Sequence, residues 1–146
     1  MNAKADTRSI SMEYELQHAP AKVWRALTEP KLLAAWLMTN DIQPTVGHRF
    51  TFRSEPTQWW DGIVQSEILE VEPHKKIAYA WRAGPESSRL DTVVTFTLTP
   101  TKSGGTRLTL EQTGFPAANR FAFDGANEGW RRMLGERLPE VLAQES

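Results

Sequence analysis

The sequence contains no cysteine, and this absence excludes several kinds of chemistry together. Disulfide bonds, thiolate nucleophiles and sulfur ligands for metal ions all require that residue. The chain also has no apolar run that approaches the roughly 20 residues of a membrane-spanning helix. Residues 1–9 are polar and lack the apolar segment of a signal peptide. We therefore expect a cytoplasmic protein without a membrane span.

The chain also lacks an excess of charge of one sign. Its formal net charge is −1 at pH 7, from 17 Lys and Arg against 18 Asp and Glu that are interspersed. No basic patch of the kind that binds nucleic acid is present. The 40% hydrophobic and 24% charged residues are ordinary for a globular protein. We expect one domain over residues 1–146, with a loose tail over residues 1–8, as a monomer or a homodimer.

Motifs for catalysis or for binding cofactors are missing as well. There is no nucleophile elbow, phosphate-binding loop or dinucleotide fingerprint. The three histidines (His18, His48 and His74) lie on separate segments without the spacing of metal ligands. His18 and His48 share strand faces with apolar residues, so we expect structural histidines there. The sequence predicts no metal, no cofactor and no catalytic residue.

What the sequence does contain is a long amphipathic helix over residues 124–146, with Asp124 as the predicted N-cap. Pro139 cannot donate a backbone hydrogen bond, so we expect a kink or a restart there. Arg137 projects into the apolar stripe. Either its stem packs on the core with the charge in water, or it is a cation at the mouth of a pocket. At 3.6 residues per turn, one face carries Phe123, Ala126, Trp130, Met133, Leu134, Leu138 and Val141.

Strands account for most of the remaining chain. Alternation of apolar and polar residues predicts a first strand over residues 9–18, and Pro20 and Pro30 then open two short helices. Residues 39–47 are expected to form a loop. In the strand predicted over residues 60–72, the alternation of apolar and polar residues slips, which predicts a bulge or a strong bend. Further strands are predicted over residues 48–53, 60–72, 77–82, 90–100 and 106–113.

This order predicts an α+β fold. The short connections make the later strands antiparallel neighbours. A single amphipathic helix cannot bury its apolar stripe alone, so the sheet must cover it. We therefore expect a strongly bent antiparallel sheet that wraps around the long C-terminal helix.

Short motifs in the same order along the chain carry a resemblance to a known family: residues 20–28, 62–64, 79–81, 94–98, 105–110, 114–115 and 129–130. Together they resemble bacterial proteins similar to the C-terminal domain of the activator of the heat-shock-protein-90 ATPase (AHSA-type). That group belongs to the START-related (SRPBCC) superfamily with the helix-grip fold. The resemblance covers residues 9–142. It implies a sheet that grips the C-terminal helix, often around an apolar cavity, and it suggests a link to the stress response.

The six tryptophans suit either a tightly packed aromatic core or a cavity lined by flat side chains. We hypothesise a pocket between sheet and helix that binds a small hydrophobic or aromatic molecule without chemistry. Tyr79 and Gln112 would orient this ligand by hydrogen bonds, and Arg137 would meet an acidic end. The predicted lining consists of inward-facing residues: Trp36, Phe50, Phe52, Val64, Tyr79, Trp81, Val94, Phe96, Leu110, Gln112, Phe115, Trp130, Met133 and Leu134.

Two other functions stay open at this point. The resemblance implies that the domain could bind a chaperone or another protein through a groove or a sheet edge. It also implies a small enzyme of the cyclase or dehydratase kind, with Tyr79 or a histidine as the general acid or base. A lined cavity favours the first function, an exposed apolar patch favours the second, and an ionisable group inside the pocket favours the third.

Overall fold

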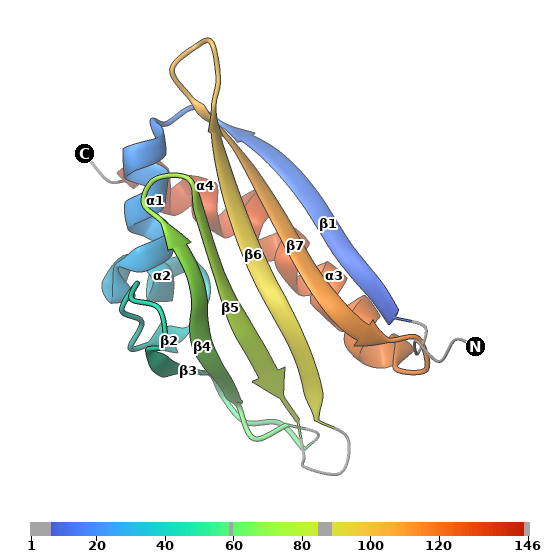
Figure 1. Ribbon diagram of the computed structural model, residues 1–146. Coiled ribbons are helices and arrows are strands. Elements are labelled where there is room, and N and C mark those ends of the chain that lie inside the picture. The colour runs from blue at the N-terminus through green and yellow to red at the C-terminus, as the bar shows by residue number, and fades with distance from the viewer. Residues whose placement is uncertain (1–6, 59, 85–88, 145–146) are drawn as a thin grey trace.

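The computed structural model describes residues 7–58, 60–84 and 89–144. In these residues a single antiparallel sheet carries all the helices on one of its faces (Figure 1). The elements are β1 (Thr7–Leu16), α1 (Pro20–Thr28), α2 (Pro30–Trp36), β2 (Thr39–Asn40), β3 (Arg49–Arg53), β4 (Ile63–Glu72), β5 (Lys76–Ala83), β6 (Leu90–Pro100), β7 (Thr106–Pro116), α3 (Arg120–Arg132), the π-helical turn η2 (Met133–Arg137) and α4 (Leu138–Gln144).

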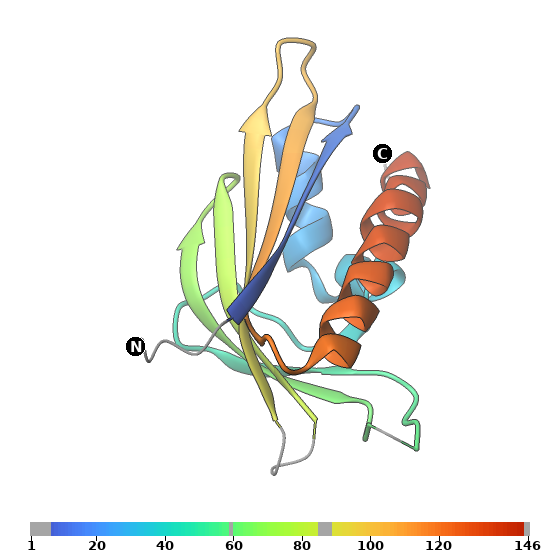
Figure 2. The same cartoon turned by 90° about the vertical axis from the view of Figure 1, so that its right-hand side faces the viewer.

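The sheet has seven strands in the order β1-β7-β6-β5-β4-β3-β2. Figure 2 shows that it curves around the C-terminal helix, with α1 and α2 on the same side. The predicted α+β fold with a bent antiparallel sheet is therefore confirmed. The first strand lies beside the last one, with Thr7 opposite Pro116 and Leu16 opposite Thr106. β1 begins at Thr7, so the predicted loose tail was wrong for residues 7 and 8, while residues 1–6 lie outside the described part.

Alternating side chains form the core between sheet and helices, as predicted. In β6, Val94, Phe96 and Leu98 are buried in the described core, and their neighbours along the strand are more exposed. The slip in the alternation of β4 corresponds to a β-bulge, because the register with β5 shifts between Ile68 and Glu70. Such a bulge bends the strand, which a sheet wrapped around a helix requires.

The two short helices both begin at proline, which needs no backbone donor at the first helical position. They are joined by a buried hydrogen bond, because the Trp36 indole N–H donates to the carbonyl of Ala26 at 2.9 Å. The predicted loop after them was wrong at one point. Thr39 and Asn40 pair with β3 and form the short edge strand β2.

The C-terminal helix begins earlier than predicted. Asn119 is the N-cap, and its side-chain oxygen accepts a hydrogen bond from the backbone N–H of Ala122 at 3.1 Å. Asp124 lies inside the helix on its exposed side, so its predicted capping role was wrong. The predicted start followed the first apolar residue of the stripe, whereas the capping side chain lies one turn before it. The apolar face itself is confirmed by the burial of Trp130, Leu134 and Leu138.

Pro139 is accommodated by the π-helical turn that precedes it. In η2 the backbone N–H of Leu138 donates to the carbonyl of Met133, five residues earlier. A wider turn relieves the clash that a proline ring makes with the carbonyl four residues before it. The predicted interruption is therefore present as a local widening, and the helix continues into α4.

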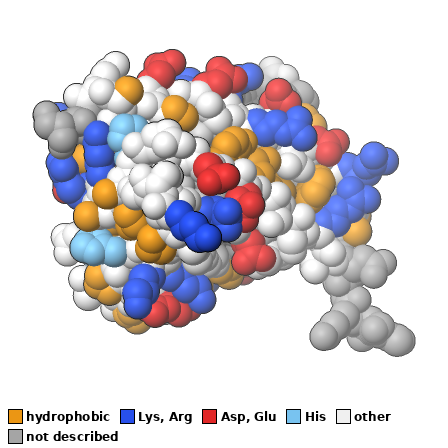
Figure 3. Space-filling model, turned by 90° about the horizontal axis from the view of Figure 1, so that it is seen from above, with side chains coloured by type: hydrophobic (Ala, Val, Ile, Leu, Met, Phe, Trp, Pro, Cys, Tyr) orange, Lys and Arg blue, Asp and Glu red, His pale blue; other side chains and the backbone are white. Residues whose placement is uncertain are grey.

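Seen from above, the surface carries basic and acidic side chains side by side with scattered apolar ones (Figure 3). This agrees with the mixed charge of the sequence. None of the described helices is long and apolar enough to cross a membrane.

Candidate ligand-binding pocket

A pocket of about 360 Å³ lies between the sheet and the N-terminal half of the C-terminal helix. Strands β4 to β7 supply one wall, α3 and the start of η2 supply the other, and the segment before β4 supplies Trp60. Its described lining is Trp60, Val64, Trp81, Ala83, Leu90, Gln112, Phe121, Ala122, Gly125, Ala126, Gly129, Trp130 and Met133.

The pocket exists because α3 presents small residues to the sheet. Ala122, Gly125, Ala126 and Gly129 follow one another at the spacing of a single helix face and all line the pocket. A Cβ added at Gly125 would meet nothing within 4 Å, so no neighbouring side chain fills this space. Trp130, one position later, is 2% exposed and packs against the sheet. The helix is therefore anchored at Trp130 and leaves a hollow beside its preceding turns.

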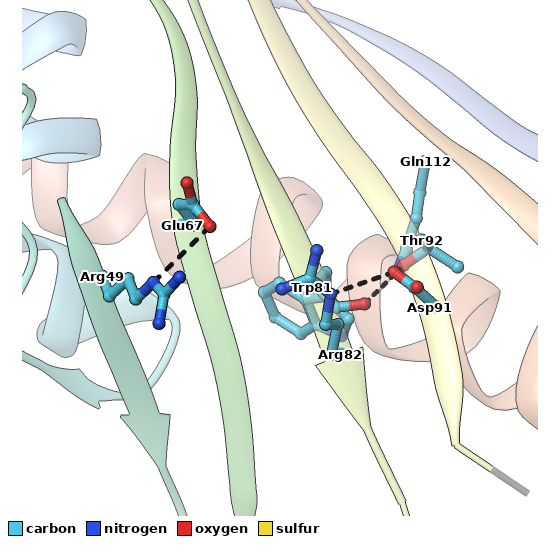
Figure 4. A network of polar contacts seen from close by, with 7 residues as sticks. All are labelled: Arg49, Glu67, Trp81, Arg82, Asp91, Thr92 and Gln112. Carbon is cyan, nitrogen blue, oxygen red and sulfur yellow. Dashed lines mark hydrogen bonds and ion pairs between the residues drawn. The ribbon is translucent and has the colours of Figure 1, made fainter. Parts of the chain in front are cut away.

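Gln112 stands at the wall of the pocket, in a buried chain of hydrogen bonds. The Trp130 indole N–H donates to Gln112 Oε1 at 2.7 Å, and Gln112 Nε2 donates to Thr92 Oγ1 at 2.9 Å. The Thr92 hydroxyl donates in turn to the carbonyl of Trp81 at 3.0 Å. Because an indole nitrogen can only donate, the orientation of the amide follows from this chain. Figure 4 shows Trp81, Thr92 and Gln112 on three neighbouring strands.

The remaining lining is apolar. None of the described lining residues has an ionisable side chain. The indole N–H of Trp60 donates to the carbonyl of Ile63 at 3.1 Å, so it too has a partner within the protein. Phe121 is 81% exposed and forms part of the border of the pocket. This arrangement can surround an apolar molecule, and it offers that molecule no acid or base.

The structure divides the predicted lining residues into three groups. Val64, Trp81, Gln112, Trp130 and Met133 do line the pocket. Arg137 is exposed and lies outside the described lining. Nine residues are instead buried in the packed core: Trp36, Phe50, Phe52, Tyr79, Val94, Phe96, Leu110, Phe115 and Leu134.

Arg137 is exposed and is not among the described residues that line the pocket, which agrees with a charge in water and not with a cation at the pocket mouth. The π-helical turn explains the difference, because its extra width changes the helical phase. Leu138 is buried instead. In a regular helix, Arg137 and Leu138 would share this inward-facing side.

The packed core is largely aromatic. Ring centroids lie 5.1 Å apart for Phe52 and Trp81, 5.3 Å for Phe50 and Phe52, and 5.5 Å for Phe50 and Tyr79. Edge-to-face and tilted pairs at such distances stabilise a core beyond their buried area. The two alternatives for the tryptophans therefore both apply. Most of the aromatic set fills the core, and its outer members line the pocket.

Tyr79 lies in this core and not in the lining. It is 1% exposed, and its hydroxyl has no hydrogen-bond partner. Burial disfavours the charged phenolate and raises the pKa of Tyr79 well above its ordinary value. The predicted role of Tyr79 in orienting a ligand therefore cannot come from direct contact in the pocket as it stands, and an acid–base role meets the same obstacle.

None of the three histidines is buried, so none reaches the interior of the described core. His18 and His48 are partly exposed and His74 is exposed. His48 stacks on Phe50 with centroids 6.0 Å apart, at the outside of the core. Partial burial and the neighbouring Lys22 lower the pKa of His18. Within the described residues, no group of three His, Asp or Glu side chains could hold a metal ion.

A second, polar depression of about 400 Å³ lies on the outer face of the sheet, over β3 to β5. Its charged lining residues have one basic side chain in excess: Arg49, Arg53 and Arg82 against Asp41 and Glu67. Arg49 Nε lies 3.8 Å from a carboxylate oxygen of Glu67, and Arg82 Nε lies 3.2 Å from one of Asp91 (Figure 4). Exposed ion pairs of this kind add little to stability. Their cationic groups remain accessible to a partner.

Sequence reasoning missed eight of the residues that line the apolar pocket: Trp60, Ala83, Leu90, Phe121, Ala122, Gly125, Ala126 and Gly129. A signal for half of them was present. Four small residues at helical spacing, directly before a large one, indicate a helix that stands away from its neighbour. Phe121 was missed because the predicted helix began after it.

Comparison with known proteins gives a consistent result. The family described as "Activator of Hsp90 ATPase homolog 1-like protein" matches residues 17–143. A Mesorhizobium loti protein of known crystal structure is 42% identical, with a TM-score of 0.87 over 95% of this chain and 99% of that one. A Bacillus halodurans protein has a TM-score of 0.76 at 24% identity, over 92% of this chain and 96% of that one, which shows the fold alone.

Two curated relatives carry the name of an activator. The "Activator of 90 kDa heat shock protein ATPase homolog" of Dictyostelium discoideum is 22% identical over 98% of this chain and 35% of its own length. The "Activator of 90 kDa heat shock protein ATPase homolog 1" of Mus musculus is 25% identical over 97% of this chain and 39% of its own length. The chain thus spans less than half of these relatives.

Proposed function

The chain belongs to the family of activator of Hsp90 ATPase homolog 1-like proteins, and from that premise we propose that it binds a small hydrophobic or aromatic molecule without altering it. The observation that carries this proposal is the composition of the apolar pocket. Its described lining has no ionisable side chain, and the amide of Gln112 is already engaged by Thr92 and Trp130. A volume of about 360 Å³ lies in the range of small-molecule sites.

Affinity in such a site comes mainly from the apolar surface that the ligand removes from water. Flat aromatic ligands suit the indole rings of Trp81 and Trp130, whose centroids lie 5.5 Å apart. A charged ligand would lose its hydration without meeting an opposite charge among the described lining residues. The preferred ligands are therefore uncharged.

The test is to fill the pocket by one substitution and to make the same substitution elsewhere on the same long helix. Ala126 lines the pocket, whereas Ala143 is exposed on α4. The probe is N-phenyl-1-naphthylamine, an uncharged dye whose fluorescence rises in apolar surroundings. We expect saturable binding at one site in the wild type and in Ala143→Phe, and at least a tenfold weaker affinity in Ala126→Phe.

The comparison of the two variants gives a clear outcome. Equal affinity of Ala126→Phe and wild type would place the dye outside the pocket and contradict the proposal. Absence of saturable binding to the wild type would contradict it as well. Far-UV circular dichroism of both variants verifies that the fold is intact.

A second candidate function is the binding of a heat-shock ATPase, with the cytoplasmic stress-response role that this partner implies. It is supported by the family and by the names of the curated relatives, of which this chain covers 35% and 39%. The polar depression with Arg49, Arg53 and Arg82 is a surface that an acidic partner fits. We expect the chain to raise the ATPase rate of a purified 90-kDa heat-shock protein.

The matched variants for this second function differ only in where the charge is reversed. Arg53 lies in the depression on β3, whereas Arg107 lies on β7, near the opposite edge of the same sheet. Loss of the stimulation in Arg53→Glu with retention in Arg107→Glu supports this face as the contact. No stimulation by the wild type would dismiss the candidate.

A further inference from the structure

Two hydroxyl groups in the core have no hydrogen-bond partner. They belong to Ser66 on β4, which is 4% exposed, and to Tyr79 on β5, which is 1% exposed. Among the described residues, these are the only buried side-chain nitrogen or oxygen atoms left in this state. Most buried polar side chains have partners, so an unpaired couple on neighbouring strands calls for an explanation.

Both groups lie beside the apolar pocket, one inner-face position further along β4 and β5. Val64 and Trp81 line this pocket, and Ser66 and Tyr79 are the next residues on the inner face of the same two strands. Residues that share a strand face are about 7 Å apart. Ser66 is opposite Trp81 in the β4–β5 register, and Tyr79 is opposite Ile68, so the two side chains are diagonal neighbours.

The Trp81 side chain lies between the apolar pocket and the two hydroxyl groups. Its indole is less firmly held than those of Trp60 and Trp130, which also line the pocket. The indoles of Trp60 and Trp130 each donate a hydrogen bond. Within the described part of the chain, no hydrogen bond holds the indole N–H of Trp81, which is fixed by ring contacts with Phe52 and Trp130. A ligand ring can replace such contacts by contacts of its own.

We infer that an entering ligand displaces the Trp81 ring and reaches the hydroxyls of Ser66 and Tyr79. The ligand class is an apolar or aromatic body with one uncharged oxygen at its inner end, as in a phenol, an alcohol or a ketone. This inference rests on the proposed binding function. The oxygen is uncharged because the described lining of the apolar pocket, through which the ligand enters, contains no cation to balance a carboxylate. The Tyr79 hydroxyl donates to that oxygen, and Ser66 donates or accepts.

The test uses two probes of nearly the same shape, 2-naphthol and 2-methylnaphthalene, which differ by a hydroxyl in place of a methyl group. Isothermal titration calorimetry measures both affinities for the wild type and for the double variant Ser66→Ala/Tyr79→Phe. The ratio of the two affinities is compared between the proteins, which removes the different hydration of the probes. We expect the preference for 2-naphthol to fall about tenfold in the variant, equivalent to about 1.4 kcal/mol at 25 °C, with the affinity for 2-methylnaphthalene unchanged within twofold.

The possible outcomes separate this inference from the function on which it rests. Suppose that both probes bind, that Ala126→Phe weakens their binding at least tenfold, and that the ratio of the two affinities is equal in wild type and double variant. The pocket then stands and the inner oxygen site is refuted. The two hydroxyls would then hold a buried water only. If neither probe binds the wild type, the proposed function and this inference both fail. The single variants Ser66→Ala and Tyr79→Phe show which hydroxyl carries the effect.

Discussion

Replacement of Gln112 by leucine would measure the buried hydrogen-bond chain behind the pocket. The substitution keeps the size of the side chain roughly constant and removes both polar atoms. The Trp130 N–H is then left buried without an acceptor, at a cost of about 1–3 kcal/mol. Thr92 loses one donor, at about 0.5–1.5 kcal/mol, but keeps its bond to the carbonyl of Trp81. The better burial of leucine offsets part of this, so we expect a net loss of about 2–3 kcal/mol.

The assays are unfolding by urea and unfolding by heat, both followed by far-UV circular dichroism at pH 7. For a domain of this length, a loss of 1 kcal/mol lowers Tm by about 3 °C, so Gln112→Leu should lower it by roughly 6–9 °C. Gln65→Leu is the control, because Gln65 is an exposed residue of β4. Its free energy of unfolding should stay within about 0.5 kcal/mol of the wild type.

A double-mutant cycle makes the reasoning specific. In a Trp130→Phe background the indole donor is already absent, so Gln112→Leu should cost about 1–2 kcal/mol less than in the wild type. Strictly additive losses would refute the idea that Gln112 acts through Trp130. If Gln112→Leu alone lowers the free energy of unfolding by less than about 0.5 kcal/mol, the expected net loss of about 2–3 kcal/mol is refuted. The sequence by itself predicts a different role for Gln112, the orientation of a ligand by hydrogen bonds.

Three further predictions concern stability and titration. Trp130→Ala should lower the free energy of unfolding by about 3–5 kcal/mol in the same urea assay, and a loss below about 1 kcal/mol would contradict its role as the anchor of α3. Gly125→Ala should raise it by about 0.5–1 kcal/mol, because the new methyl group meets no atom within 4 Å, whereas Gly104→Ala should lower it because φ is +86° there. Burial raises the pKa of Tyr79, so the neutral phenol is stabilised in the fold, and this contribution is lost only as the pH rises above about 10, the ordinary pKa of a phenol. In the folded protein, ultraviolet titration should therefore give the same curve for wild type and Tyr79→Phe; an additional phenolate in the wild type before alkaline unfolding would contradict this.

The fold could be predicted because its signals are local. Alternation along β6 and β7 reports which side chains face the helices, and the slip in β4 located the bulge between Ile68 and Glu70. Proline at the first position marked both short helices. The error at the start of α3 arose because Asn119 caps the helix through its side chain, while the exposed Phe121 hides the apolar pattern.

The site could be predicted only in part, because periodicity identifies inward-facing residues and not the space between them. Trp81 and Phe52 share the inner face of the sheet, yet only Trp81 borders the pocket. The position of the helix decides this, and that position depends on contacts between distant segments. Likewise, the partners of Gln112 come from β6 and α3, so its structural role could not be derived from its own strand.

The pairing of β1 with β7 has a consequence for how the chain matures on the ribosome. β1 emerges before the other strands, but its only neighbour among the described strands is β7, which ends at Pro116, and Thr7 pairs with that last residue. The N-terminal strand therefore stays without a partner until most of the polypeptide has been translated. Closing so long a loop carries an entropic cost that slows the final step of assembly. In a nascent chain arrested before residue 106, the amides of β1 should exchange hydrogen freely, and they should become protected once β7 has left the exit tunnel.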